Sequence, residues 1–482
     1  MTNPCSLRRA ALLALVFGSS WPGLLVAQAQ AQTERYELGR RLRDFEVAWN
    51  LANPDAAAKK RTLPHLQRAV SAFFTLRTSE VARALVEAKT ALRGDAPPKE
   101  AELWAASLAV IPARSLLDLG AQSLSATLRS AFALESERPE KLRIVVELRE
   151  DGTNDPIAWV EHVPAELPHR LQLDLSGKKL REAEHWLDLR VFVGDEVLAR
   201  SSSRVSIVAK LAERLATLNV PTPGEGAGSR STANANTDSE TLKMLARLLS
   251  GMAAGKPQET DFAALGLLAD AERIVEAHRS GKPWFGTDLR GDHLVWLRSS
   301  ERTLPIRCFV PVGLKTPAPL VIAFHGAGGS ENMFFDAYGA GAIVEQCRKL
   351  GWILVTPRGG LPNAAAVVSE LTRCLPADPK RIYLVGHSMG AANAAAAAPQ
   401  IQGVAGVALL GGGGAIRGDW TRIPTFLGAG SADFGLPGVR GSRLALERQE
   451  APRLVFREYL DIEHLAVVAV ALPDVFDFFL GH

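Results

Sequence analysis

The chain has 482 residues, a hydrophobic content of 47% and a formal net charge of only +3. This length exceeds what one ordinary hydrophobic core supports, so we expect two or three globular domains. Lysine and arginine are scattered along the chain rather than clustered. The composition therefore gives no support to nucleic-acid binding, which needs a concentrated basic surface.

Residues 1–31 are typical of a secretory signal peptide. Arg8 and Arg9 precede a short apolar core, and small-residue cleavage sites of the form Ala-Gln-Ala follow it. The alternative is a membrane anchor, but Gly, Ser and Pro interrupt the apolar run well short of the ~20 residues that a spanning helix needs. We therefore expect an exported protein, periplasmic or extracellular, with no membrane span once the signal is removed.

Removal of the signal leaves three cysteines, Cys308, Cys347 and Cys374. An odd and small number does not indicate a disulfide scaffold. A disulfide between Cys347 and Cys374 is one possibility. The favoured interpretation is that all three cysteines are small buried apolar side chains.

The front half of the chain divides by pattern into a helical and a β-rich part. Residues 34–99 carry apolar side chains spaced by three or four, which predicts a helical hairpin or small bundle, with Pro64 at the first position of a helix. Residues 100–210 alternate with period two between turns such as Asp151-Gly152, which predicts an antiparallel sandwich-like module. A spacer role is favoured over a binding role. The strands expected there are 142–148, 171–175, 186–193 and 205–208.

Residues 221–239 are poor in apolar side chains and rich in Gly, Ser, Asn and Pro, which predicts a flexible linker. Residues 240–284 then form a helical connector, with helices expected at 240–252 and 263–278. The linker is the clearest domain boundary in the sequence.

Residues 285–482 alternate between strands and helices, which is typical of a mostly parallel, doubly wound sheet covered on both faces. The overall fold class is therefore α/β, preceded by a helical segment and a β-rich module. One long helix is expected from Met333 to Leu350, ended by Gly351. Functional sites in such sheets lie at the carboxyl ends of the strands.

A nucleophile elbow is predicted at Gly386-His387-Ser388-Met389-Gly390. The apolar run before it reads as a buried strand and the Ala-rich run after it as a helix, which is the context that the G-x-S-x-G pattern requires. The glycines on either side of Ser388 let strand and helix approach closely. The pattern alone also fits a plain glycine turn between a strand and a helix. The other residues that a serine nucleophile needs must therefore distinguish the two interpretations.

A serine nucleophile needs a base, and the base needs an orienting acid. Asp433 follows a buried strand and a small-residue turn, so it is the preferred acid over Asp419 and Asp461. His464 follows the last strand and is the preferred base, since His482 is the only other histidine after the elbow.

The oxyanion of an acyl-transfer intermediate needs backbone N–H donors. We expect these from Met389, directly after the nucleophile, and from Ala327. Ala327 lies in a loop after the third strand, together with His325, Gly326 and Gly328, and we expect these three residues to support the site. A phosphate-binding loop is disfavoured because the lysine of that motif is missing.

Together these residues resemble the α/β-hydrolase superfamily over about residues 285–482. The segment from Asp378 through the elbow is similar to the esterase branch that includes polyhydroxybutyrate-depolymerase-like, feruloyl-esterase-like, dienelactone-hydrolase-like and phospholipase/carboxylesterase proteins. The resemblance implies a serine esterase with a Ser388–His464–Asp433 triad and no metal or organic cofactor.

The expected function is cleavage of carboxylic esters, either small molecules or esters displayed on a polymer, through an acyl-enzyme. The segments between strands are short, which predicts an open site without a large lid. Two alternatives stay open, a prolyl-oligopeptidase-like peptidase and a non-catalytic exported binding protein with a hydrolase-like domain.

Overall fold

The computed structural model describes residues 22–133, 138–218, 233–299, 302–314 and 317–481, without the side chains of 22–34 and 233–235. Most of the predicted signal peptide lies outside this part of the chain, although residues 22–31 belong to the first helix. Among the described residues, no helix combines the length and apolarity that crossing a bilayer requires.

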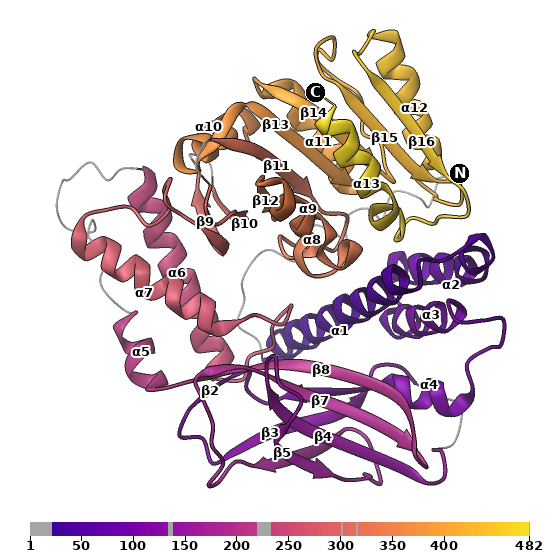
Figure 1. Ribbon diagram of the computed structural model, residues 1–482, viewed down its shortest axis with the longest axis vertical. Coiled ribbons are helices and arrows are strands. Elements are labelled where there is room, and N and C mark those ends of the chain that lie inside the picture. The colour runs from indigo at the N-terminus through magenta and orange to yellow at the C-terminus, as the bar shows by residue number, and fades with distance from the viewer. Residues whose placement is uncertain (1–21, 134–137, 219–232, 300–301, 315–316, 482) are drawn as a thin grey trace, which may run out of the picture.

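Three helices form the N-terminal segment: α1 (Pro22–Ala52), α2 (Ala56–Phe74) and α3 (Thr78–Ala91). In Figure 1 these indigo helices lie between the C-terminal sheet and the magenta β-rich module. The prediction that Pro64 begins a helix was wrong, because Pro64 lies inside α2. Asp55 caps that helix earlier, where its carboxylate accepts the Ala58 N–H at 2.8 Å.

Two packed sheets make up the β-rich module. One sheet has the order β1-β3-β6 and the other the order β2-β8-β7-β4-β5, and both contribute to a single apolar cluster. All pairs are antiparallel except β2 with β8. A sandwich therefore forms as the period-two pattern predicts. Its elements are α4 (Glu100–Ser107), β1 (Leu108–Pro112), β2 (Leu116–Asp118), β3 (Ser123–Ser130), β4 (Leu142–Glu150), β5 (Pro156–Glu161), β6 (His169–Asp174), β7 (Ala183–Val193), β8 (Glu196–Val208) and α5 (Leu211–Thr217).

The connector consists of α6 (Ala233–Ala253) and α7 (Ala264–Ser280). The predicted linker is too long at its end, since residues 233–239 belong to α6. Asp238 ties this part of α6 to the segment after α7, because its carboxylate accepts the backbone N–H groups of Trp284 (2.8 Å) and Phe285 (2.9 Å). Residues 219–232 lie outside the described part of the chain.

The C-terminal unit contains an eight-stranded sheet of order β16-β15-β14-β13-β11-β12-β10-β9. Only β10 runs against its neighbours. This is a mostly parallel, doubly wound sheet of the kind that the sequence predicted, with β13, the strand before Ser388, at its centre. The strands are β9 (Gly291–Arg298), β10 (Thr303–Val310), β11 (Ala318–Phe324), β12 (Ile353–Pro357), β13 (Ala377–His387), β14 (Val404–Leu410), β15 (Thr425–Gly430) and β16 (Leu454–Tyr459).

Helices cover both faces of this sheet. Those on one face are α8 (Met333–Asp336), η1 (Tyr338–Gly341), α9 (Ala342–Leu350) and α13 (Val467–Leu480), and those on the other are α10 (Ala364–Cys374), α11 (Met389–Ala397) and α12 (Leu436–Arg448), with η2 (Ala398–Gln400) after α11. Cys347 and Cys374 belong to these separate clusters. All three described cysteines are free and buried, so the open question of a bridge is answered against pairing.

The single helix predicted from Met333 to Leu350 is broken into three pieces. Gly339, Ala340 and Gly341 all have positive φ, between 55° and 83°. A Cβ on Gly341 would lie 2.6 Å from the Phe335 carbonyl oxygen, so only glycine fits there. The break turns Tyr338 toward the carboxyl end of β13, where it becomes part of the candidate site.

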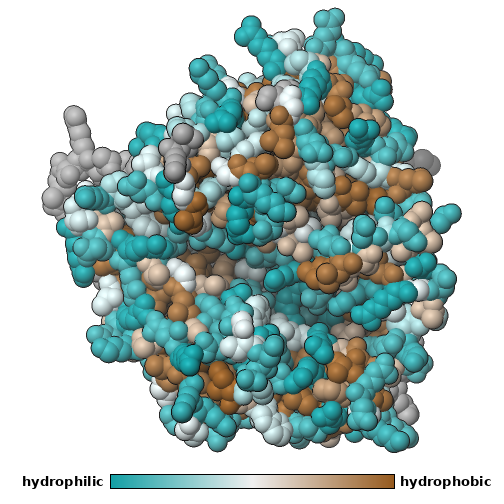
Figure 2. Space-filling view, viewed as in Figure 1, coloured by the Kyte–Doolittle hydropathy of each residue, from teal (hydrophilic) through white to brown (hydrophobic). Residues whose placement is uncertain are grey.

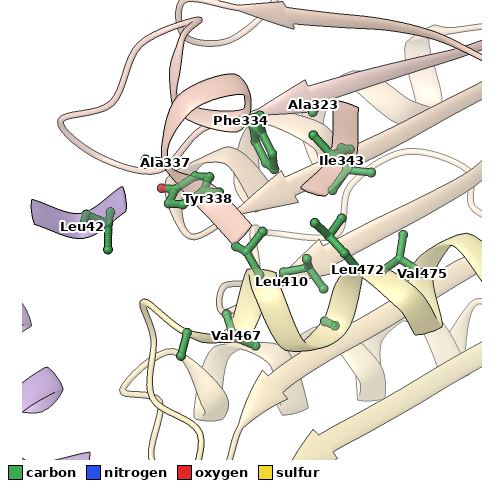
Figure 3. Packing of buried hydrophobic residues seen from close by; sticks show 14 of the residues in the cluster. Leu42, Ala323, Phe334, Ala337, Tyr338, Ile343, Leu410, Val467, Leu472 and Val475 are labelled. Carbon is green, nitrogen blue, oxygen red and sulfur yellow. The ribbon is translucent and has the colours of Figure 1, made fainter. Parts of the chain in front are cut away.

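The N-terminal helices share one apolar cluster with the sheet. Leu42, Phe45 and Trp49 of α1 belong to the same cluster as the helices on that face of the sheet. Figure 3 shows Leu42 across from Tyr338 and Ala337. Asn50 adds a hydrogen bond from its side-chain amide to the Gly339 carbonyl at 3.1 Å. The helical segment is therefore packed into the C-terminal unit, although the chain separates the two by some two hundred residues.

Candidate active site

Ser388 occupies the sharp turn between β13 and α11. Its φ of 57° and ψ of −118° form a strained backbone conformation for a residue with a side chain. The flanking glycines permit it, because a Cβ on Gly386 would lie 2.2 Å from the Gly390 carbonyl oxygen. A Cβ on Gly390 would lie 2.0 Å from the carbonyl oxygen of Phe324. The predicted elbow is thus present, with its serine at the carboxyl end of a central strand.

Asp433 and His464 come together as the sequence predicts. The Nδ1 of His464 lies 2.8 Å from Oδ1 of Asp433, and both side chains are buried. Asp433 Oδ1 also accepts the Gly435 N–H at 2.7 Å, which fixes the carboxylate. Since a carboxylate oxygen accepts, Nδ1 carries the proton and Nε2 is left with a lone pair, the tautomer that a general base needs.

The two rival acids lie in other interactions. Asp419 accepts the backbone N–H of Thr421 at 2.9 Å and caps a turn. Asp461 donates its own backbone N–H to Ser431 at 2.9 Å, and no hydrogen bond joins its carboxylate to His464 in the described structure.

The loop that is predicted to hold the oxyanion directly follows β11. The N–H of Gly326 donates to Tyr338 at 3.3 Å and that of Gly329 to the Gly326 carbonyl at 3.2 Å. Among the described residues, no acceptor is bonded to the N–H of Ala327. Met389 is the first residue of α11, and first-turn N–H groups of a helix have no partner within the helix. Both predicted donors are therefore available for a substrate oxygen.

His325 braces this loop. Its Nδ1–H donates to the Gly326 carbonyl at 2.8 Å, and its Nε2 accepts the Gly359 N–H at 3.0 Å. Burial lowers the pKa of His325, which favours the neutral ring that this bonding pattern requires. Gly329 lies close against the ring, since a Cβ there would be 2.8 Å from Nδ1.

A second buried network joins the three loops of the site, and the sequence did not predict it. His387 Nε2 lies 3.0 Å from the carbonyl oxygen of His464, so Nε2 must carry the proton. Its Nδ1 then accepts from the Tyr338 hydroxyl at 2.9 Å, and that hydroxyl accepts the Gly326 N–H. Burial holds the pKa of His387 well below its usual value, so the ring stays neutral. The only sequence signal was a histidine directly before Ser388.

Glu463 is another residue that the sequence analysis did not single out. It directly precedes His464, is buried, and accepts the Leu465 N–H at 2.8 Å. Burial raises the pKa of Glu463 to about 7. A carboxyl group that titrates beside the histidine base can influence the pH dependence of the site.

The expectation of an open site was wrong. Ser388 and His464 line a cavity of about 140 Å³, and α1, α2 and α3 supply the part of its wall that faces the loop from Gly326 to Gly329. Phe73 of α2 is so close to the oxyanion loop that a Cβ on Gly328 would lie 2.6 Å from the end of its ring. The inter-strand segments are short, as predicted, but the cover comes from the front of the chain. Figure 2 shows a recess between the upper and lower parts of this face.

Comparisons with known proteins find only a partial structural likeness. No family model matches the sequence, and neither does any curated protein. Among solved structures, a feruloyl esterase module from Clostridium thermocellum has a TM-score of 0.31 and 16% identity over 39% of this chain and 86% of its own. A ferulic acid esterase from Anaeromyces mucronatus has a TM-score of 0.32 and 14% identity over 40% of this chain and 89% of its own. An S-formylglutathione hydrolase from Staphylococcus aureus has a TM-score of 0.32 and 12% identity over 40% of this chain and 98% of its own. Activity must therefore be inferred from the residues of the site.

Proposed function

We propose that the protein is a serine esterase that cleaves carboxylic esters through an acyl-enzyme. The observation that carries this proposal is the combination at one cavity of a strained serine on an elbow and a histidine whose Nδ1 is held by a buried aspartate. A serine hydroxyl is a poor nucleophile without such a base.

In the proposed reaction, Ser388 Oγ forms a bond to the ester carbonyl carbon while His464 Nε2 takes its proton. The N–H groups of Ala327 and Met389 hold the oxyanion, and the partial positive charge at the start of α11 adds to this stabilisation. The carbon–oxygen bond to the alcohol then breaks, and the alcohol leaves with the proton from His464. Water attacks the acyl-enzyme in the same way, with His464 again as base, and releases the acid. Asp433 keeps the imidazole in the required tautomer throughout.

Hydrolysis of 4-nitrophenyl butyrate by the purified protein tests this function. We expect Ser388→Ala to lower kcat by more than about a thousandfold, because the covalent route is lost. Ser369→Ala is the matched control, since Ser369 is exposed on α10 away from the cavity. Equal rates for the two variants would rule out the serine mechanism.

Export is part of the proposal and rests on residues 1–31. Fractionation of cells that produce the full chain, with immunoblotting of each fraction, measures it. Accumulation of the uncleaved chain in the cytoplasm would contradict it.

A further inference from the structure

The cavity beside Ser388 has a wall that the catalytic unit does not supply. Leu38 and Leu42 of α1, Val70 and Phe73 of α2, and Val81 and Leu85 of α3 line it opposite the oxyanion loop. All six are apolar and come from residues 34–99, for which the sequence predicted no role in the site. The N-terminal helices therefore determine the shape of the space next to the nucleophile.

Contacts fix these helices against the catalytic loops themselves. The Phe74 ring meets Phe434 edge to face, with centroids 5.5 Å apart. Phe434 in turn packs on the His464 ring at 4.2 Å. With Phe73 against Gly328, α2 touches both the loop of the acid and the loop of the oxyanion donors. The wall is thus positioned relative to the reacting atoms, as a binding surface must be.

The chemistry of the lining excludes charged groups. The described residues that line the cavity include no aspartate, glutamate or lysine. Arg35 is the only arginine among them, and it is exposed. Both histidines at the inner end, His387 and His464, are engaged in the hydrogen bonds described above. An ionised group placed between the helices away from Arg35 would lose its hydration without gaining a partner, whereas an apolar group would gain free energy on burial.

The position of the cavity indicates which part of an ester enters it. The cavity is lined by the loop from Gly326 to Gly329 and by Met333, and on its other side by His464 and Leu465. The acyl carbonyl must lie in that loop, while the leaving alcohol must face His464 to receive its proton. Because Phe73 of α2 lies directly against Gly328 in that loop, we assign the space bounded by the helices to the acyl group.

We propose that α1, α2 and α3 form an acyl-binding pocket that selects esters of apolar carboxylic acids of about six carbons. The proposal rests on the proposed function and adds the substrate class. Its size follows from the volume of about 140 Å³, because an apolar cavity of ~150 Å³ takes up benzene. Acetate leaves this space empty, and much longer acids exceed it.

A series of 4-nitrophenyl esters with acyl chains from acetate to decanoate tests the pocket, since only the acyl group changes. We expect kcat/KM for the hexanoate to exceed that for the acetate by roughly tenfold or more, because each buried methylene can contribute up to about fourfold. A profile that is flat from acetate to hexanoate in the wild-type protein would overturn the proposal.

Two variants of α1 give a matched comparison. Leu38→Trp places a ring in the cavity and should lower the hexanoate-to-acetate ratio of kcat/KM by about tenfold. Leu51→Trp is the control, because Leu51 lies on the same helix, is 83% exposed and does not line the cavity. The same ratio in both variants would refute the assignment of the wall.

Phe73→Ala enlarges the cavity instead of filling it. It therefore still tests the pocket if Leu38→Trp fails to fold. It lengthens the cavity, so the decanoate-to-hexanoate ratio should rise several-fold, and an unchanged ratio would count against the proposal. The Ser388→Ala variant separates the two levels. Hydrolysis that needs Ser388 but ignores acyl length overturns the pocket alone, whereas no Ser388-dependent hydrolysis of any ester overturns the function as well.

Discussion

The Tyr338 hydroxyl links the oxyanion loop to the residue before the nucleophile, so its removal should affect both stability and catalysis. Tyr338→Phe deletes one oxygen that accepts from Gly326 at 3.3 Å and donates to His387 at 2.9 Å, in a site where both aromatic rings are buried. A buried polar group left without a partner costs about 1–3 kcal/mol. Two such groups, one of them in a long bond, should lower the free energy of unfolding by about 2–4 kcal/mol.

The kinetic effect follows from the neighbour of Gly326. Ala327 is the proposed oxyanion donor, and complete loss of one such donor costs about a hundredfold or more in kcat. Tyr338→Phe loosens the donor without removing it, so we expect a decrease in kcat of roughly tenfold with a much smaller change in KM. Urea denaturation and steady-state kinetics with 4-nitrophenyl butyrate measure the two effects.

Tyr383→Phe is the control for this variant. Tyr383 is equally buried, lies on β13 in the same apolar cluster, and its hydroxyl makes only a 3.5 Å contact to the Phe479 carbonyl. It should change stability by less than about 1 kcal/mol and leave kcat at the wild-type value. If the two variants behaved alike in both assays, the Tyr338–His387 network would have no positioning role.

Two further predictions concern carboxyl groups. Asp433→Asn should lower kcat by about ten-thousandfold, because the histidine tautomer is no longer held. Asp461→Asn should leave kcat close to the wild-type value. A larger loss in Asp461→Asn than in Asp433→Asn, measured in an ester assay, would refute the acid assignment. Glu46 of α1 is fully buried, and burial raises its pKa from 4.5 to about 8. Between these values the folded chain holds a proton that the unfolded chain has lost, so stability should fall as pH rises from about 4.5 to 8, by up to about 1.4 kcal/mol per pH unit. Glu46→Gln should remove that slope in urea melts from pH 5 to 9, and parallel slopes for the two proteins would contradict it.

The parts of the site that the sequence predicted are those encoded by local pattern. An apolar run, two glycines around Ser388 and an Ala-rich helix suffice to specify the elbow, because each imposes a steric or hydrophobic requirement on its own neighbours. The same holds for Asp433 and His464, which follow strands whose order in the sheet brings their ends to one edge.

The residues that were missed depend on contacts between distant segments. An apolar stripe such as that of α2 shows that a face is buried, but not that Phe73 will lie on Gly328. Tyr338 was hidden for a related reason. Ala340 favours a helix by its intrinsic propensity, yet it lies between two glycines and shares their positive φ, which breaks the helix that would have carried Tyr338 elsewhere.

The shared core of α1–α3 and the sheet also has a consequence for the order in which the chain can mature. During synthesis from the N-terminus, the apolar faces around Phe45 and Leu66 are made long before η1, α8 and α13, with which they finally share one apolar cluster. Until the last of these elements is available, the nascent chain must keep that surface from aggregating. The cavity beside Ser388 is therefore complete only once these elements are in place, and a partly folded chain lacks the helical wall next to the serine.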